Sequence, residues 1–377
     1  YSVFRYLVPL LLIIIYSMRY QLLKRVEAIF VILVAYLIVL WIFNSGDVII
    51  TSRNVLPLII TLMMIPIGKH LAESNDFLKQ FENYNRILLI CIPLYIIYAN
   101  KVGIAGFYSD AFSTGYLITS RMYIVPIVVF LAIHYALTDK NRSWLVKMID
   151  IGFILFNICI LLINTRRTTF AMLGAAIFIY ALFDRKLFIK MTVLVCFLIA
   201  TLVITYPLYQ QRLSAQLDKR ERIQELNTYN EEGRVLETKY LIRYHEKNRN
   251  IGEVLFGVKL FDTYDFGLKY FGRDRPIHSD INMILFSTGI VGMFIFFIFF
   301  RRYFFMGNNE ITPGNKILFY PLLIIFLIVL IPGRFIGTLT YPPLLMLLIS
   351  NLKYDKLPAV EPNTETDEDL AMAPLPA

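Results

Sequence analysis

Cysteine and charge are both scarce in this sequence. The 377 residues include three cysteines, Cys91, Cys159 and Cys196, and each stands inside an apolar run. A disulfide framework and a CxxC metal site are therefore excluded, and we expect these cysteines to act as small apolar side chains. Charged residues make up 17% of the chain, against about 25% in soluble domains. This shortage favours a membrane protein over a soluble enzyme.

The common motifs for nucleotides, metals and serine nucleophiles are also missing. The chain has no GxxxxGK[ST] loop, no HExxH pair and no GxSxG turn, which are typical of nucleotide, zinc and serine-hydrolase sites. The acidic residues Glu231, Glu232, Asp262 and Asp265 form no spaced pair that indicates a metal site. We therefore expect chemistry without a metal or a cofactor.

The net charge of +9 does not indicate nucleic acid. Lysine and arginine stand in short clusters between apolar runs, which is the pattern of membrane topology. No basic recognition helix or groove of stacked aromatics is evident, so we expect no nucleic-acid partner.

Long apolar runs fill most of the chain, which is 57% hydrophobic with a mean hydropathy of +0.61. A bilayer core about 30 Å thick is crossed by about 20 apolar residues in a helix. The sequence therefore predicts one all-α membrane domain, a polytopic helical bundle with about eleven spans. The predicted spans are 3–18, 26–43, 54–69, 86–100, 121–137, 148–164, 167–183, 187–206, 281–300, 315–332 and 334–351.

Alternate short loops collect the basic residues, and the positive-inside rule assigns those loops to the cytoplasm. The cytoplasmic set is Arg19, Lys24, Arg25, Lys69, Lys79, Arg86, Lys140, Arg142, Lys147, Arg185, Lys186, Lys190, Arg301, Arg302, Lys316, Lys353 and Lys356. The opposite loops carry only Arg5, Arg53, Lys101, Arg121, Arg166, Arg167 and Arg334. We therefore expect the large segment 207–280 to lie on the outer side of the membrane.

This topology divides the chain into four parts. Residues 1–206 hold the first eight spans, 207–280 form a large loop on the outer side with short amphipathic helices, and 281–351 hold the last three spans. The Pro-rich, acidic residues 352–377 are expected to be a disordered cytoplasmic tail or an appended segment. Because the chain begins with Tyr1 rather than Met, we expect one missing helix, which would give twelve spans in the full-length protein.

The first candidate site is the sequence NTRRTTF, where Arg166 and Arg167 stand at a tight turn on the outer side. Arginine presents planar donors that match phosphate oxygens, and charged residues at membrane depth are functional candidates. The alternative is that both side chains snorkel to lipid phosphates and cap the preceding helix.

The second candidate lies in the loop sequence EEGRVLETKYLIRYHEKNRN. One face of the predicted helix there is apolar and contains Val235, Leu236, Tyr240, Leu241 and Tyr244. Helical spacing makes Arg234 a neighbour of Glu237, and Lys239 a neighbour of Arg243; we expect most of these charges to be solvated. Arg234 directly follows Gly233 at the expected helix start, where backbone amides and a cation can bind an anion.

The third candidate is FGRDRPIHSDINMILFSTGIVG, in which His278 stands just before a long apolar helix. A neutral imidazole near pH 7 is the usual general base for a hydroxyl, and Asp280 could orient a neighbour or satisfy the helix start. The alternative is a capping cluster without a catalytic role. We expect further substrate contacts from a set of charged residues on the same side. That set is Arg243, Arg273, Arg275, Arg334 and Asp280.

Between residues 164 and 292 the chain resembles the superfamily of O-antigen polymerases and O-antigen ligases. Three features carry the resemblance: the turn NTRRTTFAMLG, the GR of EEGRVLE, and His278 followed by INMILFSTGIVG. The resemblance implies a glycosyltransferase of the bacterial inner membrane that moves a glycan from undecaprenyl pyrophosphate to a hydroxyl at the periplasmic face, with inversion, so the outer loop 207–280 would be periplasmic. Ser279 stands where the family commonly has Asn, so either Ser279 or Asp280 would replace that side chain.

By this resemblance, Arg166 or Arg167 together with Arg234 would bind the pyrophosphate, and His278 would activate the acceptor hydroxyl. The leading hypothesis is a polymerase of lipid-linked repeat units of O-antigen or another surface polysaccharide. The expected partners are the lipid-linked donor and acceptor, membrane lipids and a chain-length regulator protein. A ligase to lipid A core or protein, a lipid-linked oligosaccharide flippase, and a structural scaffold are the alternatives.

Overall fold

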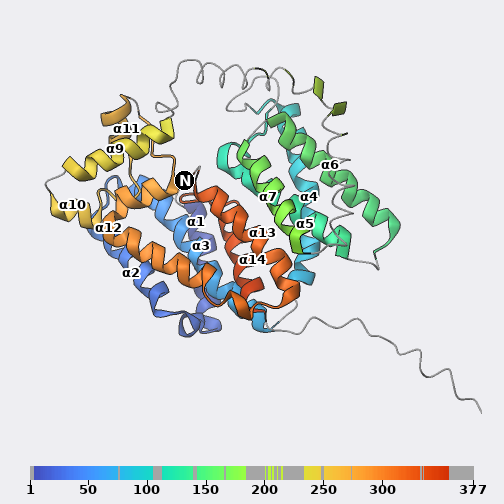
Figure 1. The fold of residues 1–377 in the computed structure, drawn as a ribbon, viewed down its shortest axis with the longest axis horizontal. Helices are drawn as coiled ribbons and strands as arrows, with labels where there is room; N and C mark the ends of the chain where they lie inside the picture. Colours follow the sequence, from blue (N-terminus) through green and yellow to red (C-terminus); the bar gives the residue numbers. More distant parts are fainter. Residues whose placement is uncertain are drawn as a thin grey trace, which may run out of the picture.

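The computed structural model describes the chain in ten continuous stretches and a few isolated residues between 200 and 214. The stretches are 4–74, 77–104, 113–138, 142–164, 167–183, 233–247, 250–272, 274–331, 333 and 335–355. Within them every regular element is a helix (Figure 1). The predicted all-α class is confirmed.

The helices of the amino-terminal half follow the predicted apolar runs. They are α1 (Phe4–Arg19), α2 (Ala28–Phe43), α3 (Val48–Ser74), α4 (Phe77–Val102), α5 (Ile124–Thr138), α6 (Trp144–Asn164) and α7 (Arg167–Phe183). Both α3 and α4 extend beyond their apolar runs. Asp47 gives one reason, because its Oδ1 accepts the amides of Ile49 and Ile50 at 2.7 and 3.2 Å and satisfies the first turn of α3.

Short helices of the predicted loop precede the final apolar helices. They are α9 (Gly233–Lys247), α10 (Ile251–Phe256) and α11 (Tyr264–Phe271), followed by α12 (Asp280–Phe300), α13 (Pro313–Leu330) and α14 (Pro342–Tyr354). A π-helical turn, Arg301–Phe305, continues α12. The predicted span 187–206 and the tail after residue 355 lie outside the described residues, apart from a few isolated positions in the span.

Six described helical segments are long and apolar enough to cross a bilayer. They are Val48–Glu73, Phe77–Val102, Thr119–Thr138, Trp144–Ile163, Asp280–Glu310 and Pro313–Leu330. Two shorter apolar helices, Ala28–Phe43 and Arg167–Phe183, accompany them. This composition is that of a multi-pass helical membrane protein. The number of eleven spans and the periplasmic position of the loop stay predictions.

The centre of the bundle is built from helices distant in sequence. α14 lies against α3, where the Ser350 hydroxyl donates to the carbonyl of Ile65 at 2.7 Å. Gly68 allows this approach, because a Cβ there would collide with the carbonyl of Leu347. α13 lies beside α7, where the rings of Phe183 and Tyr320 stack at 5.4 Å.

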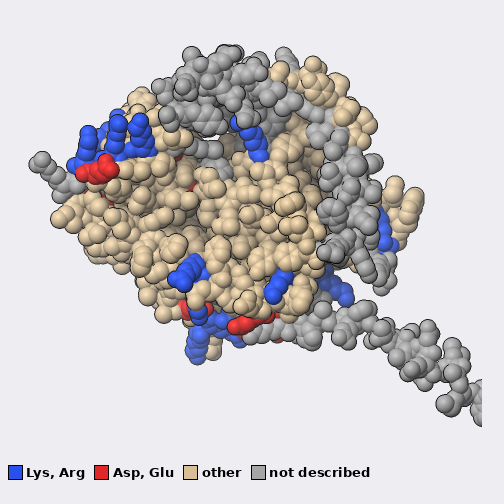
Figure 2. All heavy atoms as spheres, in the orientation of Figure 1, with Lys and Arg blue, Asp and Glu red and all other residues tan. Residues whose placement is uncertain are grey.

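Charged side chains gather at opposite ends of this bundle. Figure 2 shows Lys and Arg over α9 at one edge and again along the opposite edge, with a broad band of other residues between. At the second edge Arg25 pairs with Glu73, and Arg302 pairs with Glu27. Arg25 and Arg302 belong to the set predicted to share one side of the membrane. Which side of the membrane this is stays a prediction.

A second group of charges joins α4 to α6. Asp150 is almost fully buried and accepts hydrogen bonds from Arg86 at 3.0 Å and from Arg142 at 2.5 Å. Arg142 also pairs with Glu82 of α4. Four charges in a closed network satisfy one another where a single buried charge would be costly.

α12 is broken at Gly289, which adopts φ 66° and ψ −170°. The chain changes direction there (Figure 1), and the turn before the break packs against the loop that follows α10. The amide of Val258 donates to the carbonyl of Phe286 at 3.0 Å, and the Tyr36 hydroxyl donates to the carbonyl of Thr288 at 2.7 Å. Carbonyls released by the break are therefore satisfied. The part of α12 before the break packs against the loop helices α9 and α10, and the part after it packs against α2.

We predict that Gly289→Ala destabilises the protein. A side chain at this left-handed φ costs about 1–3 kcal/mol, and its Cβ would also collide with the backbone of Leu255. Thermal unfolding in detergent should show a lower Tm. The matched control is Gly174→Ala in α7, where nothing lies within 4 Å of the added Cβ, and its Tm should stay the same or rise. Equal Tm values for both variants would contradict the role of the break.

Candidate active site

The side chain of Glu237 lies at the centre of a polar cluster beneath α9. It is fully buried, and its Oε1 lies 2.9 Å from Nδ1 of His278. Its Oε2 accepts the backbone amide of His278 at 3.1 Å, and the Arg275 guanidinium pairs with Oε1. Both residues of the predicted site therefore meet a carboxylate that the sequence did not single out.

These contacts determine the tautomer of His278. A carboxylate oxygen can only accept, so the hydrogen bond to Glu237 requires a proton on Nδ1. Arg275 Nη2 lies 3.1 Å from the same Nδ1, but it carries only donors, and the ionised carboxylate of Glu237, with which it pairs, is the stronger acceptor. The other ring nitrogen, Nε2, then carries the lone pair. His278 is 31% exposed, and no partner of Nε2 is found among the described residues, so Nε2 can accept a proton.

The surroundings of Glu237 keep it ionised. Burial alone raises the pKa of its carboxyl group, but hydrogen bonds from the side chain and backbone of His278 act in the opposite direction, as does the positive charge of Arg275. The result is a pKa below the usual value. The buried carboxylate is thus stabilised by the same groups that it positions.

Arg275 is held on both sides. Its guanidinium stacks over the ring of Phe271 at 4.2 Å, and its backbone carbonyl packs so closely on Gly267 that a Cβ there would collide with it. Two residues later, the amide of Ile277 donates to the hydroxyl of Thr263 at 2.9 Å. The segment that carries His278 is therefore fixed against α11 before α12 begins.

Asp280, predicted to contact substrate or to satisfy the helix start, has a different set of partners. It is completely buried, and its oxygens accept the amides of Phe335 and Ile336 at 2.7 and 3.1 Å. Nearby, Gly333 has φ 86°, and a Cβ there would collide with the carbonyl of His278. Asp280 thus fastens the loop between α13 and α14 beside His278.

The side chain of Ser279, one of the two candidates for the Asn position of the resemblance, does not cap α12. Ser279 is at the N-cap but makes no side-chain capping bond. One turn into the helix, Asn282 donates from Nδ2 to the Thr238 hydroxyl at 2.9 Å. This bond holds α9 against α12 beside Glu237.

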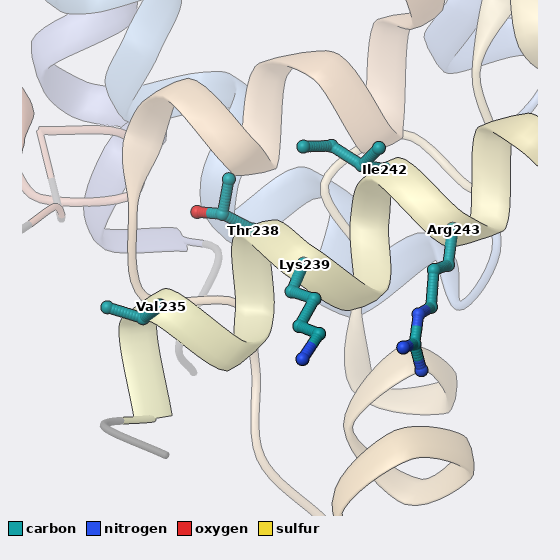
Figure 3. Close-up of a pocket in the computed structure, with 5 residues that line it drawn as sticks. All are labelled: Val235, Thr238, Lys239, Ile242 and Arg243. Carbon is teal, nitrogen blue, oxygen red and sulfur yellow. The ribbon is translucent and has the colours of Figure 1, made fainter. Parts of the chain in front are cut away.

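The other side of α9 forms an open groove of about 480 Å³ (Figure 3). Apolar side chains of Val235 and Ile242 line it, together with Thr238 and the cations Lys239 and Arg243. The two cations project to the same side of the helix (Figure 3), as the predicted helical spacing required. A groove with apolar and cationic walls suits an anion that carries a hydrocarbon chain.

The remaining predicted arginines are not brought to His278 by described contacts. Arg167 begins α7 and is exposed. Arg166, Arg273 and Arg334 lie outside the described residues, as does the side chain of Arg234. Their convergence on a diphosphate stays a prediction.

Glu237 was predicted to be solvated beside Arg234, and this prediction was wrong. A signal for its burial existed in the sequence. Glu237 stands four residues before Leu241 and seven before Tyr244, on the apolar stripe of the helix. A lone carboxylate on such a stripe needs a buried partner, which His278 and Arg275 supply. Val235 was assigned to the same apolar face but is 42% exposed and lines the groove.

Comparison of the whole chain with protein-family models, curated proteins and solved structures found no match.

We predict that Glu237→Gln makes the protein less stable at neutral pH. Since the pKa of Glu237 lies below its ordinary value of 4.5, its stabilisation is fully present above that value and is lost as pH falls through the folded-state pKa. The difference in unfolding free energy between wild type and variant should therefore be constant at neutral pH and shrink below about pH 4.5. Thermal and denaturant unfolding in detergent at a series of pH values measures it.

Glu246→Gln is the matched control, since Glu246 is an exposed carboxylate on the same helix. It should leave stability unchanged across this range. A Glu237→Gln protein as stable as wild type at pH 7 would contradict the buried charge cluster.

Proposed function

We propose that this protein is a metal-independent, inverting glycosyltransferase of the bacterial inner membrane that polymerises oligosaccharide units carried on undecaprenyl pyrophosphate. The observation that carries the proposal is the Glu237–His278 pair, which leaves Nε2 of His278 open as a base. The resemblance of the surrounding motifs to O-antigen polymerases and ligases supports the choice of substrate. The proposed topology has eleven spans in this chain, with residues 207–280 on the periplasmic side.

The proposed reaction uses His278 as the general base. Nε2 takes the proton of an acceptor hydroxyl as its oxygen attacks the anomeric carbon of the donor glycan. The bond between that carbon and the pyrophosphate oxygen breaks, so the diphosphate leaves with its electron pair and the anomeric centre is inverted. Glu237 stabilises the imidazolium that forms, because its carboxylate stays hydrogen-bonded to Nδ1.

Negative charge grows on the departing diphosphate, and fixed cations stabilise that charge without reorganising. We propose that Arg234 and Arg166 or Arg167 contact the diphosphate, with Arg273 and Arg334 as further contributors. The groove on α9 offers Lys239 and Arg243 beside apolar Val235 and Ile242, which suits a phosphate joined to a polyprenyl chain. Arg275 and Asp280 act as positioning residues, since their described contacts hold His278 in place.

The first prediction of this proposal concerns His278→Ala. A general base contributes about 10²- to 10⁴-fold to the rate, so the variant should lose polymerisation by about that factor. Purified protein in nanodiscs, supplied with undecaprenyl-pyrophosphate oligosaccharide, should yield longer lipid-linked chains and free undecaprenyl pyrophosphate. Mass spectrometry of the extracted lipids measures both products.

The control is His70→Ala, which removes a histidine from the same end of α3 as the Arg25–Glu73 pair. It should retain activity. No product from the wild-type protein, or equal activity of His278→Ala and wild type, would overturn the proposal. Transfer to lipid A core in place of a second lipid-linked unit would instead identify the chain as a ligase.

The second prediction is that Glu237→Gln lowers kcat, by no more than the roughly 10²- to 10⁴-fold that a general base contributes, and leaves the KM for the lipid donor unchanged. Glutamine can still accept the Nδ1 proton, but it carries no charge to stabilise the imidazolium. Glu246→Gln should leave both constants unchanged. A change confined to KM would indicate that Glu237 supports donor binding and not proton transfer.

A further inference from the structure

A cavity of about 600 Å³ lies at the end of the bundle that holds Arg302 and the last turn of α3. Four helices end or begin around it: α2 and α3 near Glu27 and Glu73, α12 near Arg302, and α14 near Lys353. It is remote from His278, which precedes the opposite end of α12. The charged residues that line it are Glu27, Lys69, Glu73, Arg302, Glu310 and Lys353.

Two of the lining cations form no salt bridge within the described part of the chain. Arg302 is already paired with Glu27, and Glu73 is paired with Arg25 from outside the cavity. Lys69, in contrast, donates to the carbonyl of Arg25 at 3.3 Å and lies 5.0 Å from the ring centre of Tyr354. These two contacts are with neutral groups, so the ammonium group, which has three donors, has donors to spare.

Lys353 likewise forms no described salt bridge, and its side chain is more deeply buried. It is 8% exposed, and its Nζ donates to the carbonyls of Tyr303 and Met306 at 2.7 and 2.6 Å. An ammonium group has three donors, so one remains. Its hydrogen bonds are made to neutral carbonyls, and the lining carboxylates Glu27 and Glu310 act on it only electrostatically, without an ion pair among the described residues, so the ammonium group can still bind an anion directly.

The backbone at this place is also unusual. Tyr303 belongs to the π-helical turn Arg301–Phe305, and π-helical turns occur frequently at functional sites. Gly307 follows with φ 72°, lines the cavity and has nothing within 4 Å of its Cβ position. The cavity is therefore open beside the two lysines, at the level where α3 and α14 end.

We propose that this cavity binds a phosphate group, and that Lys69 and Lys353 are its ligands. Compact ammonium groups bind phosphate as point charges, and basic pockets between membrane helices bind anionic headgroups. A phospholipid headgroup and a free phosphate share this chemistry. The site is independent of the proposed glycosyl transfer.

The test is thermal unfolding of the delipidated protein in detergent with three additives: dioctanoyl phosphatidylglycerol, inorganic phosphate and dioctanoylglycerol. The phospholipid should raise the Tm of the wild type, and the uncharged diacylglycerol should not. An equal rise with inorganic phosphate would identify a free phosphate as sufficient. A rise with the phospholipid alone would identify a lipid site.

Lys69→Gln should weaken the apparent affinity for the stabilising additive by about tenfold or more, which is 1.4 kcal/mol, and Lys69→Arg should restore it. Lys24→Gln is the matched control, since Lys24 is an exposed lysine whose one hydrogen bond is to Gln21, and it should respond like wild type. Because Lys353→Gln would also remove the hydrogen bonds to the carbonyls of Tyr303 and Met306, the response of Lys69→Gln is the result that decides the test.

The proposal is overturned if neither phosphate compound raises the wild-type Tm above the effect of the diacylglycerol. It is also overturned if Lys69→Gln responds as the wild type does. Polymerase assays play no part in these outcomes, so failure here leaves the proposed function untouched.

Discussion

The buried carboxylate of Glu237 is the interaction on which the candidate site depends. Removing an ion from water costs several kcal/mol, and here the cost is offset by donors from His278 and Arg275. The packing of α9 on α12 therefore requires both residues in position. A histidine held in place by an ionised carboxylate follows directly from the way in which a charge is satisfied in an apolar environment.

The break in α12 provides the geometry for this arrangement. If α12 were straight, residues 280–288 would continue along the axis of the rest of the helix, with a rise of about 1.5 Å per residue. With the break, residues 280–288 turn toward the loop between α13 and α14, where Asp280 receives two backbone amides. Unpaired carbonyls at membrane depth would be costly, and Val258 and Tyr36 pair with those at the break.

Much of the fold could be predicted from the sequence because apolar runs of sufficient length determine where helices form. The boundaries of α2 and α7 agree with the predicted runs within two residues. The apolar run 281–300 predicted one continuous helix, and its break depends on close contact between Gly289 and the backbone of Leu255. The hydropathy of the sequence does not indicate such a contact. The ends of α3 and α4 were missed for a related reason, since polar residues end an apolar run without ending a helix.

The site was predictable only in part. His278 and Arg275 were found because basic residues beside an apolar helix are conspicuous, whereas the role of Glu237 depends on a partner 41 positions away. Asp280 was noticed for its position at the helix start, but its partners lie 55 and 56 residues later. Local spacing cannot reveal pairings of this range.

Those distant partners impose an order on biosynthesis. Phe335, Ile336 and Gly333, which hold Asp280 and enclose the His278 backbone, leave the ribosome after the whole of α13. A nascent chain that has completed the loop helices still lacks these restraints, and the imidazole is secured only when the last helical hairpin is inserted. In an incomplete chain the His278 backbone is therefore not yet held against the loop that follows α13, which is a consequence of the connectivity of the fold itself.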